Sequence, residues 1–349
     1  MERKMPDESF KSYKDVIDYL KSKKNRRINL LFGNGFSIAY DRNIFSYNAL
    51  SNFVKESCSD PMTSKLFDIV GSTNFETVMR HLNSFVKLGG LFLPDLDVES
   101  IVSPARQKLK DNLIKAISEL HPEYVFKISE QESKSCADFL KPFLDSKGVI
   151  FSTNYDLLLY WVLMRESDSF TRQILDGFSR KNEDEDLTWE TGTQNIFYLH
   201  GSLMLFEEGN SIVKEEYTGD FILENIKKRI YNDQYPIFVT GGTKEEKLDT
   251  IFHNHYLSYC YDKLANLTGS LVVIGFGFGK YDTHIIDAIN QAAKIRKGRN
   301  GFLCSIFIGY YSEEDREYLI DLCSQFDVPP EKIRIFNAKT ANIWDNAPR

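Results

Sequence analysis

The chain has 349 residues, of which 42% are hydrophobic and 27% charged, and its formal net charge is −7. Such a length and composition are those of a globular protein with one large domain or two modest ones. The negative charge provides no general attraction to nucleic acid or to anionic lipid, and no apolar segment is long enough to span a bilayer. Because the N-terminus is polar and charged, unlike a secretory signal, we expect a cytoplasmic protein.

The cysteines and histidines do not predict a metal site. The five cysteines are scattered, odd in number and never spaced as a C-x-x-C pair, which argues against a disulfide framework and a structural zinc site. His253 and His255 lie two residues apart on a predicted helix, where they do not share a face. We therefore expect no metal.

Predicted helices and short apolar strands alternate along most of the chain. Such alternation favours a Rossmann-like α/β fold, in which a parallel sheet carries helices on both faces. In chain order we predict a helix over 8–22, a strand over 28–32, helices over 47–57, 75–88 and 107–120, a strand over 149–151, a helix over 157–164, strands over 196–199 and 236–240, a helix to about 267, a strand over 271–274, a helix from 282, and strands over 303–308 and 333–336 with a helix between them.

A single domain is expected to span residues 1–349. Residues 60–145 have helical periodicity, with a break predicted at Gly89-Gly90, and indicate a helical insertion between the first two strands of the sheet. Residues 203–235 are polar, aromatic and weakly periodic, and are expected to form a small irregular module or lid.

Three short polar segments directly follow predicted strands. They are Gly33–Ser37, Ser152–Asp156 and Leu199–Ser202. In an open α/β sheet, residues just beyond the carboxyl ends of the strands line the ligand crevice. We therefore expect these segments, which are far apart in sequence, to face one cleft.

The first segment, Gly33-x-Gly35-x-Ser37, is a candidate phosphate site. Two glycines let backbone N–H groups approach a diphosphate closely, and a following helix adds a favourable dipole. The alternative is structural, because such a turn also packs a helix tightly onto a sheet. Ile38 stands where the full dinucleotide fingerprint has its last glycine, which argues against a hydride-transfer dehydrogenase.

The other two segments carry acid–base and hydrogen-bonding groups. Asn154 and Asp156 offer an amide and a carboxylate to one ligand, although either residue is also a candidate cap for the helix over 157–164. His200 is a candidate general base near neutral pH, and Gly201 allows a sharp turn beside it. A structural role for this histidine is the alternative.

A second glycine-rich turn follows the strand over 271–274. Gly275 and Gly277 permit another close approach of backbone to a ligand, for example to an adenosine ribose. The alternative is a tight strand-to-helix turn, in which Asp282 caps the next helix.

Together and in chain order, these segments resemble the motifs of the sirtuin-like NAD-binding superfamily. Sirtuins carry Gly-Ala-Gly-x-Ser, then a Gln-Asn-Ile-Asp type motif, then His-Gly, then a glycine-rich strand end. The resemblance covers roughly residues 28–50, 147–202 and 236–340. The counterparts in this chain are Gly33–Ser37, Asn154–Asp156, His200-Gly201 and Ile274–Gly277.

The zinc-binding cysteine pairs of the sirtuin deacylases are missing from this chain. The chain is therefore more similar to zinc-free bacterial sirtuin-like proteins, which include NAD-degrading effectors of anti-phage defence. This resemblance implies an NAD⁺ hydrolase that releases nicotinamide and ADP-ribose, with NAD as substrate and no metal. It also implies a homo-oligomer that is activated by a partner protein or a phage-derived trigger.

The resemblance also assigns roles to the matching residues. Gly33, Gly35 and Ser37 are expected to hold the diphosphate. Asp156 is expected to accept a hydrogen bond from the nicotinamide carboxamide, and Asn154 to orient the nicotinamide ribose and the attacking water.

His200 is expected to act as general base towards a ribose hydroxyl or that water. Two other functions stay open. A non-catalytic sensor of NAD⁺ or ADP-ribose needs the glycines but not His200, and an NAD-dependent protein deacylase needs a cleft for an acylated lysine.

Overall fold

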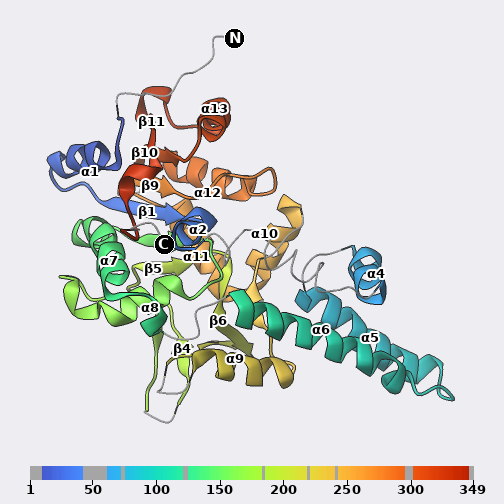
Figure 1. The fold of residues 1–349 in the computed structure, drawn as a ribbon. Helices are drawn as coiled ribbons and strands as arrows, with labels where there is room; N and C mark the ends of the chain where they lie inside the picture. The colour runs from blue at the N-terminus through green and yellow to red at the C-terminus, as the bar shows by residue number, and fades with distance from the viewer. Residues whose placement is uncertain are drawn as a thin grey trace.

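The computed structural model describes residues 10–41, 61–71, 75–120, 125–182, 185–217, 221–239, 243–294 and 302–345. Within these residues the chain forms one parallel and one antiparallel sheet, with helices packed against them (Figure 1). The helix predicted over 47–57 lies outside the described residues. No helix in the described part of the chain is long and apolar enough to cross a membrane.

Six parallel strands form the larger sheet. They are β1 (Ile28–Phe32), β2 (Ile150–Ser152), β5 (Ile196–Tyr198), β9 (Gly269–Ile274), β10 (Leu303–Tyr310) and β11 (Ile333–Asn337). Their order is β11-β10-β9-β1-β2-β5, so the chain proceeds from β1 to one edge and then returns to the other side of β1. This order reverses between β1 and β9, as in a Rossmann fold, and confirms the predicted fold class.

The central strands are apolar because both faces of the sheet are covered. All five residues of β1 are buried, including one polar side chain, Asn29. The Nδ2 atom of Asn29 donates to the carbonyl oxygens of Thr268 (2.9 Å) and Ser270 (3.0 Å). Its Oδ1 atom accepts from the amide of Val149 at 3.1 Å. One side chain thus ties β1 to the starts of both neighbouring strands.

Helices cover both faces of this sheet (Figure 1). On one side lie α1 (Tyr13–Ser22), α7 (Glu130–Asp145) and α8 (Leu158–Arg165), and on the other α11 (His255–Ala265), α12 (Thr283–Ala293) and α13 (Glu313–Leu322). A short helix, α2 (Asn34–Tyr40), follows β1 directly.

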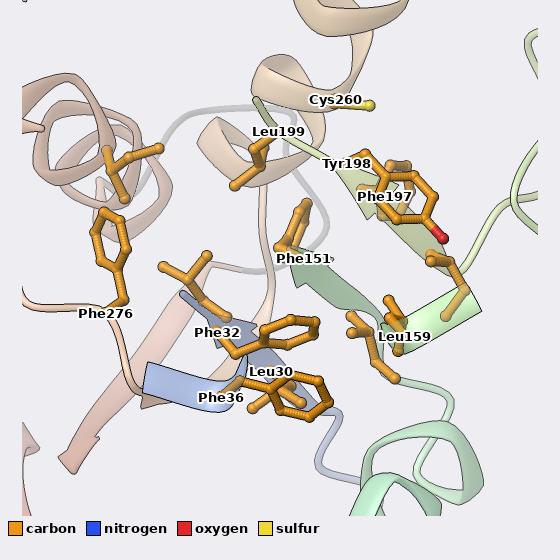
Figure 2. Packing of buried hydrophobic residues seen from close by; sticks show 14 of the residues in the cluster. Leu30, Phe32, Phe36, Phe151, Leu159, Phe197, Tyr198, Leu199, Cys260 and Phe276 are labelled. Carbon is orange, nitrogen blue, oxygen red and sulfur yellow. The ribbon is translucent and has the colours of Figure 1, made fainter. Parts of the chain in front are cut away.

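Figure 2 shows apolar packing at the carboxyl ends of the central strands. The ring of Phe32 in β1 lies 4.3 Å, centroid to centroid, from that of Phe36 in α2. Phe151 of β2 stacks on Phe197 of β5 at 5.1 Å. These contacts hold the start of α2 against the sheet edge where the candidate site residues lie.

The helical insertion contains α4 (Pro61–Val70), α5 (Phe75–Phe92) and α6 (Val98–Leu120), and the α5–α6 pair projects away from the sheets (Figure 1). The predicted break at Gly89-Gly90 is wrong, because α5 continues through both glycines. A Cβ atom on Gly89 would lie 2.8 Å from Cγ1 of Val98, so the glycine permits close packing of α5 on α6. Helix α7 instead contacts β1 and α8 and belongs to the layer beside the sheet.

The smaller sheet is antiparallel, with the order β3-β4-β7-β6-β8. Its strands are β3 (Phe178–Ser179), β4 (Leu187–Trp189), β6 (Gly201–Glu208), β7 (Ser211–Lys214) and β8 (Pro236–Phe238). Helix α9 (Ile222–Tyr231) packs on β6. The region 203–235, predicted to be irregular, therefore consists largely of β6, β7 and α9.

Three differences from the predicted elements have identifiable causes. Residues 201–206 of β6 are all buried, so this strand lacks the alternation that identifies a half-exposed strand. The strand predicted at 236–240 forms as β8 but pairs antiparallel with β6 and does not join the parallel sheet. The predicted helix to about 267 is divided into α10 (Lys244–His253) and α11, because the side chain of Asn254 caps α11 at the amide of Leu257 (3.0 Å).

We predict that Asn29→Ala lowers the free energy of unfolding by about 2–4 kcal/mol, because three backbone groups lose their partner inside the sheet. Urea unfolding followed by circular dichroism measures the change. Asn266→Ala, at an exposed position, is the control and should change stability by less than about 1 kcal/mol. Equal effects of the two substitutions would contradict this role for Asn29.

Candidate functional site

The candidate site lies where the strand order reverses, at the carboxyl ends of β1 and β9. Here the two glycine-rich turns are in direct contact. The amide of Gly35 donates to the carbonyl of Gly275 at 2.8 Å, and the amide of Gly33 donates to that of Ile274 at 3.2 Å. Gly275 has a φ of +66°, and a Cβ atom on Gly35 would lie 2.5 Å from the Cα atom of Gly275. Only glycines permit this approach.

The structure therefore gives both glycine turns a packing role. The amides of Gly33 and Gly35 already donate to the β9 turn, so the diphosphate role assigned to them stays a prediction. Gly277 differs from the other three, because a Cβ atom there would have no neighbour within 4 Å.

Three predicted site residues form one buried hydrogen-bonded chain. Nδ2 of Asn154 donates to Oγ of Ser37 at 2.8 Å, and that hydroxyl donates to Oδ2 of Asp156 at 2.6 Å. Ser37 comes from α2, and the other two follow β2. The structure thus brings together side chains that are more than a hundred residues apart in sequence.

Asp156 also binds the start of the helix that follows it. Its Oδ1 atom accepts from the amide of Leu158, the first residue of α8, at 2.9 Å, although the N-cap of this helix is Leu157 and not Asp156. Burial raises the pKa of Asp156 above its ordinary value, while hydrogen bonds from Ser37, Leu158 and Asn154 oppose the rise. The carboxylate is held by the protein at both oxygens.

His200 lies at the end of β5, beside the residues that follow β2. The carbonyl of Tyr155 accepts from the amide of Leu203 (2.9 Å) and the hydroxyl of Ser202 (3.1 Å), which links the two strand ends. The imidazole of His200 is fully buried, and its Nε2 atom lies 2.9 Å from Nε2 of His284 in α12.

The two histidines form a neutral pair. Burial is the main cause that lowers the pKa of each to about 3, and the positive charge of Lys247 lowers both further. The Nδ1 atoms of both rings are buried without a hydrogen-bond partner of good geometry, although the backbone of Tyr281 acts on the ring of His284 and raises its pKa. His284 was not among the predicted site residues; the available signal was its position in Asp282-Thr283-His284, directly after the second glycine-rich turn.

A buried ion pair lies next to these imidazoles. Nζ of Lys247 in α10 donates to Oδ1 of Asp282 at 2.5 Å, and both side chains are buried. Asp282 occupies the N-cap position of α12, but its side chain makes no capping hydrogen bond, so that part of the prediction is wrong.

His200, Asp282 and His284 also form a group that could hold a metal ion, with their ligand atoms within 4.8 Å of one another. Three features weigh against a metal there. The Nε2 atoms are hydrogen-bonded to each other, and Nδ1 of His200 lacks the acceptor that usually orients a metal-bound imidazole. The ammonium of Lys247 already neutralises the carboxylate.

A further polar group at this edge was not predicted. The Nδ2 atom of Asn34, in the first turn of α2, is buried without a partner. Of the five such side-chain atoms among the described residues, three belong to Asn34, His200 and His284. Because buried polar groups in proteins are almost always hydrogen-bonded, this concentration marks the edge as a place where a polar ligand would supply partners.

A family model described as a domain of unknown function, DUF4917, matches residues 30–344. The chain belongs to the DUF4917 family. The matched residues contain the helical insertion, every residue of the candidate site and both sheets, except for the first two residues of β1. No curated protein matches the chain.

A hollow of about 240 Å³ in this DUF4917 protein lies at the opposite edge of the parallel sheet. Its lining includes Arg27, Val149 and Thr268, which precede strands and therefore lie at their amino ends. Ligands of open α/β sheets bind at the carboxyl ends, so this hollow is not the candidate site.

We predict that Gly275→Ala destabilises the protein by at least about 2 kcal/mol, because its φ is positive and a Cβ atom would lie 2.6 Å from the amide nitrogen of Phe36. Gly277→Ala is the matched control in the same turn and should change stability by less than about 1 kcal/mol. Denaturant unfolding measures both. Similar losses would show that the turns do not pack as described.

We also predict that the protein loses stability in mild acid. Below pH 6.5 the unfolded chain protonates both histidines, whereas the folded state keeps them neutral down to about pH 3. Stability is therefore complete above pH 6.5 and falls as the pH is lowered, by about 1.4 kcal/mol per pH unit for each histidine. Urea unfolding between pH 7.5 and 5 measures the slope.

The double variant His200→Gln/His284→Gln should have a clearly flatter pH dependence than the wild type. An unchanged slope in the double variant would contradict the neutral, buried state of the pair.

Proposed function

We propose that the chain is an NAD⁺ hydrolase that cleaves the nicotinamide–ribose bond and releases nicotinamide and ADP-ribose. The observation that carries this proposal is the concentration of unpartnered polar atoms at the carboxyl edge of the sheet, next to the Ser37–Asn154–Asp156 chain. A dinucleotide bound at this reversal of the strand order is the usual ligand of such a sheet.

The proposed chemistry places modest demands on the protein. Cleavage of the glycosidic bond builds positive charge on the ribose, so catalysis depends mainly on holding the ribose and positioning one water. Asn154 would orient the nicotinamide ribose and that water, and Asp156 would accept from the carboxamide. Both side chains are already fixed by Ser37, which supports a preorganised site.

His200 would accept the proton from a ribose hydroxyl or from the water. Its low pKa keeps the imidazole unprotonated at neutral pH and therefore able to accept, although it also makes His200 a weak base. An oxocarbenium-like ribose is a strong electrophile, so a weak base is compatible with the reaction. The same proposal includes a role in anti-phage defence, assembly into a homo-oligomer, and activation by a partner protein or a phage-derived trigger.

A second candidate is a non-catalytic sensor that binds NAD⁺ or ADP-ribose. The observation that favours it is the same low basicity of His200, together with an Asp156 carboxylate held at both oxygens by the protein. Such a protein would use the site for binding alone.

We predict that the purified wild type releases nicotinamide from NAD⁺, and that Asn154→Ala and His200→Ala lower the rate by about 100-fold or more. Chromatography of nicotinamide and ADP-ribose measures turnover, and thermal unfolding checks that the variants fold. His253→Ala, at an exposed position, should retain the wild-type rate.

Equal release by all four proteins would refute the assigned site. If the wild type releases no nicotinamide, calorimetric titration with ADP-ribose decides between the candidates. Binding that is lost in Asn154→Ala, with no turnover under any condition, would favour the sensor, whereas no binding would refute both functions.

A further inference from the structure

The buried histidine pair leaves each imidazole with one unused nitrogen. The Nε2 atoms of His200 and His284 share a hydrogen bond of 2.9 Å, so the Nδ1 atom of each ring is the one left for another partner. Within the described residues neither Nδ1 atom has a hydrogen-bond partner of good geometry, although the backbone of Tyr281 acts on the ring of His284 and raises its pKa. Both rings are fully buried.

A purely structural role explains this arrangement poorly. A buried Nδ1 atom without a hydrogen-bond partner destabilises the fold, and two apolar side chains of similar size would avoid that cost. Buried polar groups that weaken the fold are found mainly at functional sites, where a ligand or a reaction makes use of them.

The shared hydrogen bond couples the protonation states of the two rings. In a neutral pair only one Nε2 carries the bridging proton, so the two histidines must be opposite tautomers. If His200 is the donor, its Nδ1 atom keeps a lone pair and can accept a proton. If His284 is the donor, the Nδ1 atom of His200 carries a hydrogen and cannot act as a base.

We propose that His284 is a positioning residue that accepts a hydrogen bond from Nε2–H of His200 and thereby holds Nδ1 of His200 ready to accept a proton. This inference rests on the proposed NAD⁺ hydrolysis. His284 does not touch the substrate and acts only through His200.

The proton balance of the step is simple. The nicotinamide–ribose bond breaks, and its electron pair leaves with neutral nicotinamide. The oxygen of the attacking water then bonds to the anomeric carbon while the water, directly or through a ribose hydroxyl, loses one proton to Nδ1 of His200. His200 then carries hydrogens on both ring nitrogens and continues to donate from Nε2 to His284. The neutral His284 thus stabilises the imidazolium as it forms, as a hydrogen-bond acceptor behind a catalytic histidine generally does.

The surroundings keep His284 in place. The hydroxyl of Tyr261 in α11 donates to its backbone carbonyl at 3.1 Å, and Asp282 precedes it in the chain by two residues. The charged groups that act on the pair are Asp282 and Lys247, which bind each other. Burial is the main reason that the pKa of each histidine is low, so both rings remain neutral at the pH of the reaction.

Three variants separate the proposed role from a structural one. His284→Gln retains an acceptor for Nε2–H of His200, His284→Leu removes it, and His253→Gln is an exposed control. We expect His284→Leu to lower kcat for NAD⁺ by about 100-fold with little change in KM, and His284→Gln to recover most of that loss. Equal kcat values for the Gln and Leu variants would overturn the proposal.

A second measurement does not depend on turnover. In protein labelled with ¹⁵N-histidine, two-bond ¹H–¹⁵N spectra at pH 7 report the tautomer of each ring in the absence of NAD⁺. We expect the hydrogen on Nε2 of His200 and on Nδ1 of His284, with the tautomer of His200 retained in His284→Gln. A hydrogen on Nδ1 of His200 would overturn the proposal, whatever the measured rate of nicotinamide release.

The two measurements distinguish the possible failures. A wild type with the expected tautomers that never releases nicotinamide refutes the proposed hydrolysis, and with it the catalytic use of the pair. A wild type that hydrolyses NAD⁺ while His284→Leu matches it refutes only the role of His284. Loss of wild-type activity in EDTA and its recovery with Zn²⁺ would overturn the proposal in favour of a metal ligand.

Discussion

The backbone contact between the two glycine-rich turns is the constraint on which the site depends. The amide of Gly35 reaches the carbonyl of Gly275 only because neither residue has a side chain, and this contact places the start of α2 beside the end of β9. Ser37 lies on the first turns of α2, so the same contact determines where its hydroxyl meets Asn154 and Asp156. A packing requirement of the sheet thereby sets the geometry of the polar cluster.

The polar groups at this edge are arranged so that little net charge is buried. The charges of Lys247 and Asp282 neutralise each other. The two histidines are neutral and are joined by one hydrogen bond between their Nε2 atoms. Isolated charges are costly to bury, whereas a closed pair leaves the interior close to neutral. In the proposed reaction the ribose becomes positively charged. It would then face hydrogen-bond acceptors, and the ammonium of Lys247 would already be neutralised by Asp282.

The sequence predicts the strands of the parallel sheet and the polar segments that follow them well, because buried parallel strands are uninterrupted apolar runs that end at glycine or polar residues. It does not predict β3, β4, β6 and β7 of the smaller sheet. It does not predict which sheet a short apolar run joins, as β8 shows, since pairing with β6 depends on contacts distant in the sequence. The continuity of α5 through Gly89 is also hidden, because the glycine is accommodated by Val98 of the neighbouring helix. His284 is not predicted because its partner, His200, lies 84 residues away in the sequence.

The low basicity of His200 narrows the reactions that this edge can support. A buried imidazole with a pKa of about 3 cannot generate a strong nucleophile, so acyl or phosphoryl transfer that depends on such activation fits the site poorly. A reaction whose electrophile forms first, and which needs a proton removed only as the new bond closes, makes the smaller demand. Glycosidic cleavage at a ribose is of that kind. The property that most weakens His200 as a base thus favours N-glycoside hydrolysis over the other hydrolytic chemistries.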